Sequence, residues 1–151
     1  MIEIADRPFV ASEFLARFED GEQGEGAIVS FVGKVRAAAK NDTVTALVLE
    51  HYPGVTERSI QKIEDEALSR WAINRVAIIH RVGKLLPGEA IVMVCVSSAH
   101  RRDAFEAADF LMDYLKTEAM FWKKEIRANG QSWIEPRSDD YNDAARWKKG
   151  K

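Results

Sequence analysis

The stretch Ala90-Ile-Val-Met-Val-Cys-Val96 is apolar at every position. A strand with one face in water alternates apolar and polar residues, so this strand is predicted to be covered on both faces. Upstream, Pro87-Gly88 has the residue order of a type II turn and joins it to a second strand at Arg75–Val82. Downstream, a helix is predicted from an N-cap at Ser98 to about Lys116. This hairpin and helix are the centre of the predicted fold.

Further elements are predicted on both sides of this centre. Extended segments lie at Ile2–Ala5, Gly26–Arg36, Val44–Tyr52, Phe121–Arg127 and Gln131–Ile134, with a polar loop at Ala37–Asp42 and a charged tail at the end. A short helix holds Phe14, Leu15 and Phe18, and a long one, capped by Thr56, carries Ile60, Ile63, Ala67 and Trp71 on one stripe. The helix after Ser98 is predicted to turn Ala104, Phe105, Ala108, Leu111, Met112 and Leu115 inward. The order β-α-β-β-α-β-β-α-β-β predicts an α+β, two-layer domain with a mainly antiparallel sheet.

Length and composition limit the class of protein. A chain of 151 residues fits one domain, residues 1–151, with a full core. The net charge of −2 means that any basic binding site is local. No apolar run reaches the roughly 20 residues that span a bilayer, and the N-terminus does not resemble a signal peptide. One cysteine excludes an internal disulfide, so we expect a cytoplasmic protein.

The segment Asp113–Glu125 gathers three lysines among large apolar side chains. Lys116, Lys123 and Lys124 stand beside Tyr114, Met120, Phe121 and Trp122. This mixture is typical of a pocket for an anion. Lys123 and Lys124 are adjacent in a predicted strand, so at most one of them faces a given site, and periodicity does not choose between them. A lysine at the end of a helix, as Lys116 is, more often has no role beyond suiting the helix dipole.

A second basic cluster, His100 and Arg101, lies in the first turn of the helix after Ser98. The helix dipole disfavours cations there, whereas a bound anion would be held by free backbone N–H groups and both side chains. The residues alone leave open whether the pair binds an anion or reaches into water. Arg36, which ends a strand, is by default a solvated arginine.

Other reactive residues favour a structural interpretation. The three histidines are scattered and there is no second cysteine, so no metal site is expected. Cys95 lies in the most apolar strand, where a buried thiol is a poor nucleophile. No phosphate-binding glycine loop or dinucleotide fingerprint occurs, and no cofactor is expected.

Several segments together resemble the large, catalytic subunit of molybdopterin synthase. They are Gly26–Arg36, Leu49–Gly54, His80–Glu89, Ser98–Arg101, Asp113–Thr117 and Phe121–Glu125. They occur in the family's order from about Gly26 to Trp133, and their joint presence carries the resemblance. It implies a hammerhead-type α/β subunit, a homodimer, and a heterotetramer with two copies of a small ubiquitin-like subunit.

The resemblance also implies a reaction. The C-terminal Gly-Gly of the small subunit carries a thiocarboxylate, whose tail enters a pocket on the large subunit. This sulfurtransferase moves two sulfurs to cyclic pyranopterin monophosphate and so makes molybdopterin, the dithiolene ligand of the molybdenum cofactor. Neither a nucleic acid nor a membrane is implied as a partner. Because Cys95 is the only thiol, a sulfur that arrives on a partner fits the composition.

The family's motifs assign roles to six residues of this chain. Lys116 and Lys123 match its catalytic lysines, which favours Lys123 over Lys124. Arg36, His100 and Arg101 match the family's pocket residues for the substrate phosphate and the incoming tail. Phe31 matches an aromatic residue of the same pocket. Met120 stands where the family usually has a proline, which would fix the backbone; a methionine there is expected to loosen the lysine segment.

Two functions from other classes are compatible with the residues. Phe121, Trp122, Lys123 and Lys124 could form a stacking platform for single-stranded nucleic acid, although the acidic net charge argues against it. Alternatively, the protein could be a non-catalytic scaffold for a ubiquitin-like partner. Such a scaffold would bind the partner tightly without turnover.

Overall fold

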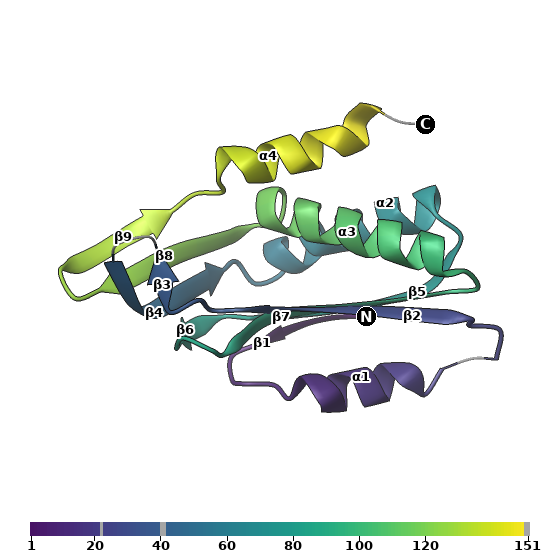
Figure 1. Ribbon diagram of the computed structural model, residues 1–151, viewed down its shortest axis with the longest axis horizontal. Coiled ribbons are helices and arrows are strands. Elements are labelled where there is room, and N and C mark those ends of the chain that lie inside the picture. The colour runs from purple at the N-terminus through teal and green to yellow at the C-terminus, as the bar shows by residue number, and fades with distance from the viewer. Residues whose placement is uncertain (22, 40–41, 150–151) are drawn as a thin grey trace.

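The computed structural model describes residues 1–21, 23–39 and 42–149. Its first sheet has four strands in the order β1 (Ile2–Ala5), β5 (Ile73–Arg81), β7 (Ala90–Ser98) and β2 (Ala27–Lys34). β7 pairs antiparallel with both neighbours, and only β1 runs parallel to its neighbour β5. The expected α+β class and mainly antiparallel pairing are therefore confirmed (Figure 1).

Two long helices cover one face of this sheet. α2 (Val55–Arg70) buries Ile60, Ile63 and Ala67, as its stripe predicted, and α3 (Arg101–Thr117) buries Phe110 and Leu111. These residues pack with the inward side chains of β5 and β7, such as Ile78 and Val94, in the largest core cluster. α3 follows directly from β7 and runs back across the sheet (Figure 1).

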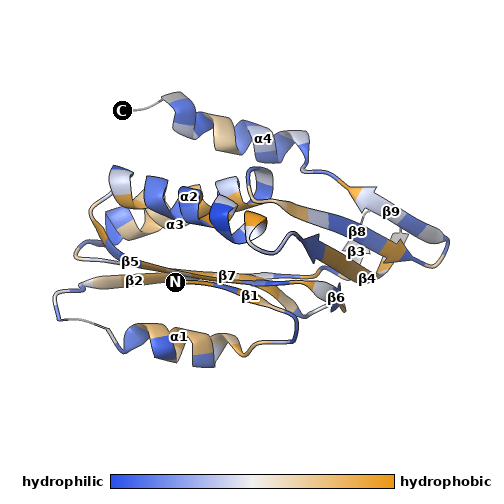
Figure 2. Ribbon diagram, turned by 180° about the vertical axis from the view of Figure 1, so that it is seen from behind, coloured by the Kyte–Doolittle hydropathy of each residue, from blue (hydrophilic) through white to orange (hydrophobic). Residues whose placement is uncertain are grey.

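A third helix covers the opposite face. α1 (Ala11–Glu19) buries Phe14 and Phe18 against Met93 and Cys95 of β7. β7 is therefore covered on both faces, as its unbroken apolar sequence predicted, and Figure 2 shows apolar strands between the helices. The prediction of two layers thus holds for the sheet with α2 and α3, and α1 adds a layer on the other side.

A second sheet stands beside the first. Its strands β3 (Ala38–Ala39), β4 (Asp42–His51), β8 (Phe121–Arg127) and β9 (Gly130–Ile134) pair antiparallel in that order, and β6 (Gly83–Leu85) also pairs with β4. The polar loop expected at Ala37–Asp42 is partly wrong, because Ala38–Ala39 is a strand; residues 40 and 41 lie outside the described residues. The turn at Pro87-Gly88 is confirmed: Gly88 has a φ of 89°, and the Glu89 N–H donates to the Leu86 carbonyl.

The charged tail folds into a helix that the sequence analysis did not predict. α4 (Ser138–Ala145) continues into a 3₁₀ turn, η1 (Arg146–Lys149), and lies over α3 on the side away from the sheet (Figure 1). Trp147 of η1 packs edge-on against Trp71 and Phe110, with ring centroids 5.5 and 5.7 Å away. The tail thus covers the outer side of α3.

Three local predictions are wrong. Ser98 is the last residue of β7 rather than an N-cap, and His100 is the N-cap of α3. The N-cap of α2 is Gly54, while Thr56 is fully buried inside the first turn. Phe105 points outward, with 61% of its surface exposed, because it lies beside the buried stripe rather than on it.

Candidate active site

The end of α3 and the start of β8 bring Lys116 and Lys123 together. Three residues separate the helix from the strand, so the lysines lie on adjoining elements. Burial lowers the pKa of Lys123, and the neighbouring charge of Lys116 lowers it further, whereas Asp140 and Glu125 act in the opposite direction. The two amino groups are therefore close enough to interact. Lys123 as a whole keeps a solvent-exposed surface, so it is also reachable from solvent.

The strand alternation separates Lys123 from Lys124. Phe121, two residues before Lys123, stacks on His80 at 3.9 Å between ring centroids and belongs to the core side of β8. On the other side, Trp122 packs edge-on against Tyr52, and the Lys124 amino group lies 5.0 Å from the ring centroid of Trp133. Lys123 therefore lies on the same face of β8 as Phe121, and Lys124 lies on the opposite face with Trp122. The four residues of the stacking platform considered above therefore do not share one face.

His80 forms the inner wall beside Lys123. It is buried, and its Nδ1 lies 2.9 Å from the backbone carbonyl oxygen of Arg81. Desolvation lowers the pKa of His80 to about 4, and the charge of Lys123 contributes in the same direction. The imidazole is therefore neutral at physiological pH, and it adds no positive charge to the lysine pair.

The segment before the lysine strand is held by α2. The Met120 N–H donates to Ser59 Oγ at 3.1 Å, and the Met120 carbonyl accepts from Thr56 Oγ1 at 2.6 Å. Thr56 Oγ1 also accepts from the Tyr52 N–H at 3.0 Å. A proline at this position could not donate to Ser59. The expected loosening at Met120 is therefore offset by a hydrogen bond that the methionine backbone can make.

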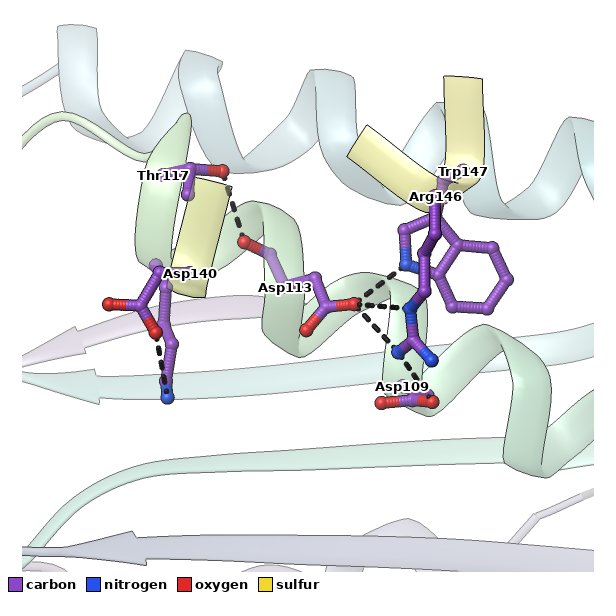
Figure 3. Close-up of polar contacts among 7 residues, drawn as sticks. Asp109, Asp113, Thr117, Asp140, Arg146 and Trp147 are labelled. Atoms are coloured by element: carbon purple, nitrogen blue, oxygen red, sulfur yellow. Dashed lines mark hydrogen bonds and ion pairs between the residues drawn. The ribbon is translucent and has the colours of Figure 1, made fainter. Parts of the chain in front are cut away.

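The structure adds a residue of α4 that the sequence analysis missed. Asp140 Oδ1 lies 3.4 Å from the amino group of Lys116 (Figure 3). Asp140 Oδ2 accepts from the Arg137 N–H at 2.8 Å. The one signal in the sequence was an acid at the third helical position, Asp140, whose side chain can accept from the backbone N–H of the residue that precedes the helix. Without the fold, nothing connected that helix to Lys116.

The second basic cluster lies at the other end of α3. His100 and Arg101 line an open cavity of about 570 Å³ together with Arg102, Phe105 and Gly26. His100 caps α3 with an extended backbone, so the free N–H groups of the first helical turn are close by. The cavity combines cations, helix N–H groups and an exposed aromatic ring, which suits an anion that carries a flat ring system.

The two clusters do not meet within one chain. Arg101 and Lys116 are fifteen residues apart on α3, which corresponds to roughly 22 Å along the helix axis. Arg36 follows the end of β2 at which Lys34 pairs with Ala90. His100 follows the other end of this strand pair, at which Ser98 pairs with Ala27. Phe31 lies midway along β2, opposite Val94, with 42% of its surface exposed. Arg36 thus lies at the end of the sheet opposite to the one that precedes His100 and Arg101.

Cys95 is not available as a sulfur carrier. It is fully buried under α1, and desolvation, aided by the charge of Glu19, raises the pKa of its thiol to about 11. Within residues 1–21, 23–39 and 42–149, His, Cys, Asp and Glu side chains form no group of three that could hold a metal ion. In the same ranges, no helix is both long and apolar enough to cross a membrane.

Known proteins resemble this chain over nearly its whole length. Residues 4–118 match the family model described as MoaE protein. The molybdopterin synthase catalytic subunit of Escherichia coli K12 is 49% identical over 146 residues, which cover 97% of each chain. The solved molybdopterin biosynthesis MoaE protein of Burkholderia ambifaria superposes with a TM-score of 0.84 at 46% identity, over 99% of each chain. A protein–protein complex of subunits 1 and 2 of molybdopterin-converting factor from Helicobacter pylori contains a chain with the same fold. That chain has a TM-score of 0.76 at 21% identity and covers 91% of this chain and 92% of its own.

Proposed function

This chain belongs to the family of molybdopterin synthase catalytic subunits, and from that premise we propose that Lys116 and Lys123 perform its chemistry. The reaction moves two sulfurs from the C-terminal thiocarboxylate of a small ubiquitin-like subunit to cyclic pyranopterin monophosphate, which becomes molybdopterin. The observation that supports the assignment is the position of the two lysines on adjoining elements, with Lys116 in the last turn of α3 and Lys123 near the start of β8. One cysteine, which excludes an internal disulfide, is in keeping with a cytoplasmic location.

The chemistry requires both a cation and a proton acceptor. Each transfer breaks the carbon–sulfur bond of one thiocarboxylate and forms a carbon–sulfur bond to the pterin side chain. Each sulfur takes the place of one oxygen of the hydrated substrate, and the acyl carbon of the carrier gains one oxygen in exchange, directly or through water, so the carrier is released as a carboxylate. We assign the proton transfers to Lys123, because a lowered pKa makes its uncharged amine more accessible near neutral pH. Lys116, which is exposed, holds the anionic thiocarboxylate as an ammonium, with Arg36 beside the entering tail.

A second copy of the chain completes the site in this proposal. The family resemblance implies a homodimer that binds two small subunits. Because His100 and Arg101 lie roughly 22 Å along α3 from Lys116, they cannot hold the substrate of the lysines in the same chain. We propose that His100 and Arg101 of one copy bind the substrate phosphate that reacts at the lysines of the other, with Phe31 packing against the pterin.

The proposed roles are tested by single-turnover sulfur transfer. The protein is mixed with a thiocarboxylated ubiquitin-like partner and cyclic pyranopterin monophosphate, and mass spectrometry follows the gain of two sulfurs. Lys116→Ala and Lys123→Ala are each expected to slow the transfer by about 100-fold or more while partner binding stays within about threefold of wild type. Lys124→Ala is the matched control, since this neighbour lies on the opposite face of β8, and it should transfer sulfur at nearly the wild-type rate.

Two outcomes would overturn the proposal. Near-normal dithiolene formation by both alanine variants would remove the two lysines from the chemistry. Tight partner binding without any sulfur gain by the wild-type protein would favour the non-catalytic scaffold instead.

A further inference from the structure

We propose that Asp140 is a positioning residue that holds the Lys116 amino group in place for sulfur transfer. The inference rests on the proposed function, and it gives the C-terminal helix a part in the reaction. Its basis is the ion pair between Asp140 Oδ1 and the Lys116 amino group at 3.4 Å, in which the aspartate is the less exposed partner, at 19% against 56%.

The Asp140 carboxylate is fixed independently of the lysine. Its second oxygen accepts from the Arg137 N–H at the N-terminus of α4, so one carboxylate both caps the helix and pairs with Lys116. A long lysine side chain on the surface otherwise samples many rotamers, and an ion pair to a fixed partner restricts them. Asp140 can therefore orient Lys116 without itself touching the substrate.

The helix that carries Asp140 is anchored to the same helix as Lys116. Asp113 Oδ2 accepts from the Trp147 ring N–H at 2.7 Å and pairs with the Arg146 guanidinium at 2.8 Å, and Asp109 pairs with Arg146 at 2.7 Å (Figure 3). These contacts lie one and two turns before Lys116 on α3. They fix the far end of the tail, so the Asp140–Lys116 distance is set by two attached helices rather than by a free tail.

Asp140 also balances the charges around the lysines. Lys116 and Arg137 act on Lys123 as cations, and Glu125 and Asp140 act as anions, while the neutral His80 lies behind it. Removal of Asp140 leaves two cations, Lys116 and Arg137, against the single carboxylate of Glu125, so the pKa of Lys123 should fall further. Arg137 keeps its capping partner in Asp140→Asn, because an asparagine oxygen can still accept from its N–H.

The first test follows the lysines directly and does not depend on turnover. Wild type, Asp140→Asn and Asp139→Asn are compared by NMR titration of the lysine side-chain carbons. Asp139 is the matched control, since it lies in the same helical turn and carries the same charge. Asp140→Asn should lower the pKa of Lys123, and Asp139→Asn should leave it nearly unchanged. Equal titration curves in all three proteins would overturn the inference.

The second test separates positioning from folding. In single-turnover transfer, Asp140→Asn should lose roughly tenfold in rate at its optimum, and the part of the pH–rate profile that rises with pH should move to lower pH. The pterin concentration that gives half of the maximal rate should change little. Asp139→Asn should match wild type in rate and pH profile. Wild-type activity without any change in Asp140→Asn would reject the positioning role alone, whereas an inactive wild type would reject the proposed function.

Discussion

At the level of single residues, the choice of Lys123 over Lys124 shows what alternation can and cannot predict. The sequence indicated that adjacent strand residues face opposite ways, but it contained no signal for which face meets the site. The structure adds that Phe121 stacks on His80, so the face of β8 that carries Phe121 and Lys123 is the one next to the core, and the assignment of Lys123 to the site stays a prediction. Cys95 needed no such context, because an unbroken apolar strand already predicts a buried thiol, as the structure confirms.

The neutral state of His80 predicts a pH dependence of stability. Its pKa is about 4 in the folded protein and about 6.5 when exposed, so the unfolded chain binds the extra proton more readily. The neutral His80 side chain therefore contributes to the free energy of unfolding, and above pH 6.5 this contribution is present in full. It is lost as the pH falls toward 4, by roughly 3 kcal/mol in all.

Urea denaturation between pH 4.5 and 7.5 measures this dependence. His80→Gln should show a shallower loss of stability toward acid than wild type, whereas His100→Gln, at an exposed histidine, should keep the wild-type slope. Parallel slopes for wild type and His80→Gln would contradict the assignment of a buried neutral imidazole.

At the level of elements, the strands of four residues or more and the helices α1 to α3 were predictable from their apolar patterns, whereas the short strands β3 and β6 were not. α4 was not, because Tyr141, Ala144 and Ala145 form a weak stripe among charged residues. Its docking depends on partners distant in sequence, namely Asp113 and the rings of Trp71 and Phe110. Asp140 was missed for the same reason, since its role follows from where α4 docks.

Trp147 is expected to hold the C-terminal helix on α3. Trp147→Ala removes a partly buried ring and the hydrogen bond to Asp113, so it should reduce the free energy of unfolding by about 2 kcal/mol. Amide hydrogen exchange in α4 should become faster than in α3, and sulfur transfer should fall as in Asp140→Asn. Trp133→Ala, at a ring that is 56% exposed, is the control and should cost less than about 1 kcal/mol. Unchanged exchange in α4 would show that the helix is held by other contacts.

At the level of the whole molecule, the sequence predicted two basic clusters but not their separation. Both clusters were placed near one helix, and its length of 17 residues puts them at opposite ends. A pattern along a chain does not say which residues meet across a dimer. The roles of Arg36, His100, Arg101 and Phe31 therefore stay predictions, as does the assignment of residues 1–151 to one domain.

The central claim is that the lysines of one copy and the His100 cluster of another form one active site. A mixture of Lys123→Ala with His100→Ala tests it by single-turnover sulfur transfer. In a mixed dimer, one copy carries Lys123→Ala and the other carries His100→Ala. If each site takes its lysine from one copy and its histidine from the other, one of the two sites has both residues intact. If each site takes both residues from the same copy, neither site is intact. The account predicts that each variant is nearly inactive alone, and that after subunit exchange the mixture recovers about a quarter of the wild-type activity, because random pairing makes half of the dimers mixed. No recovery, despite mixed dimers detected by native mass spectrometry, would contradict a site shared between two copies.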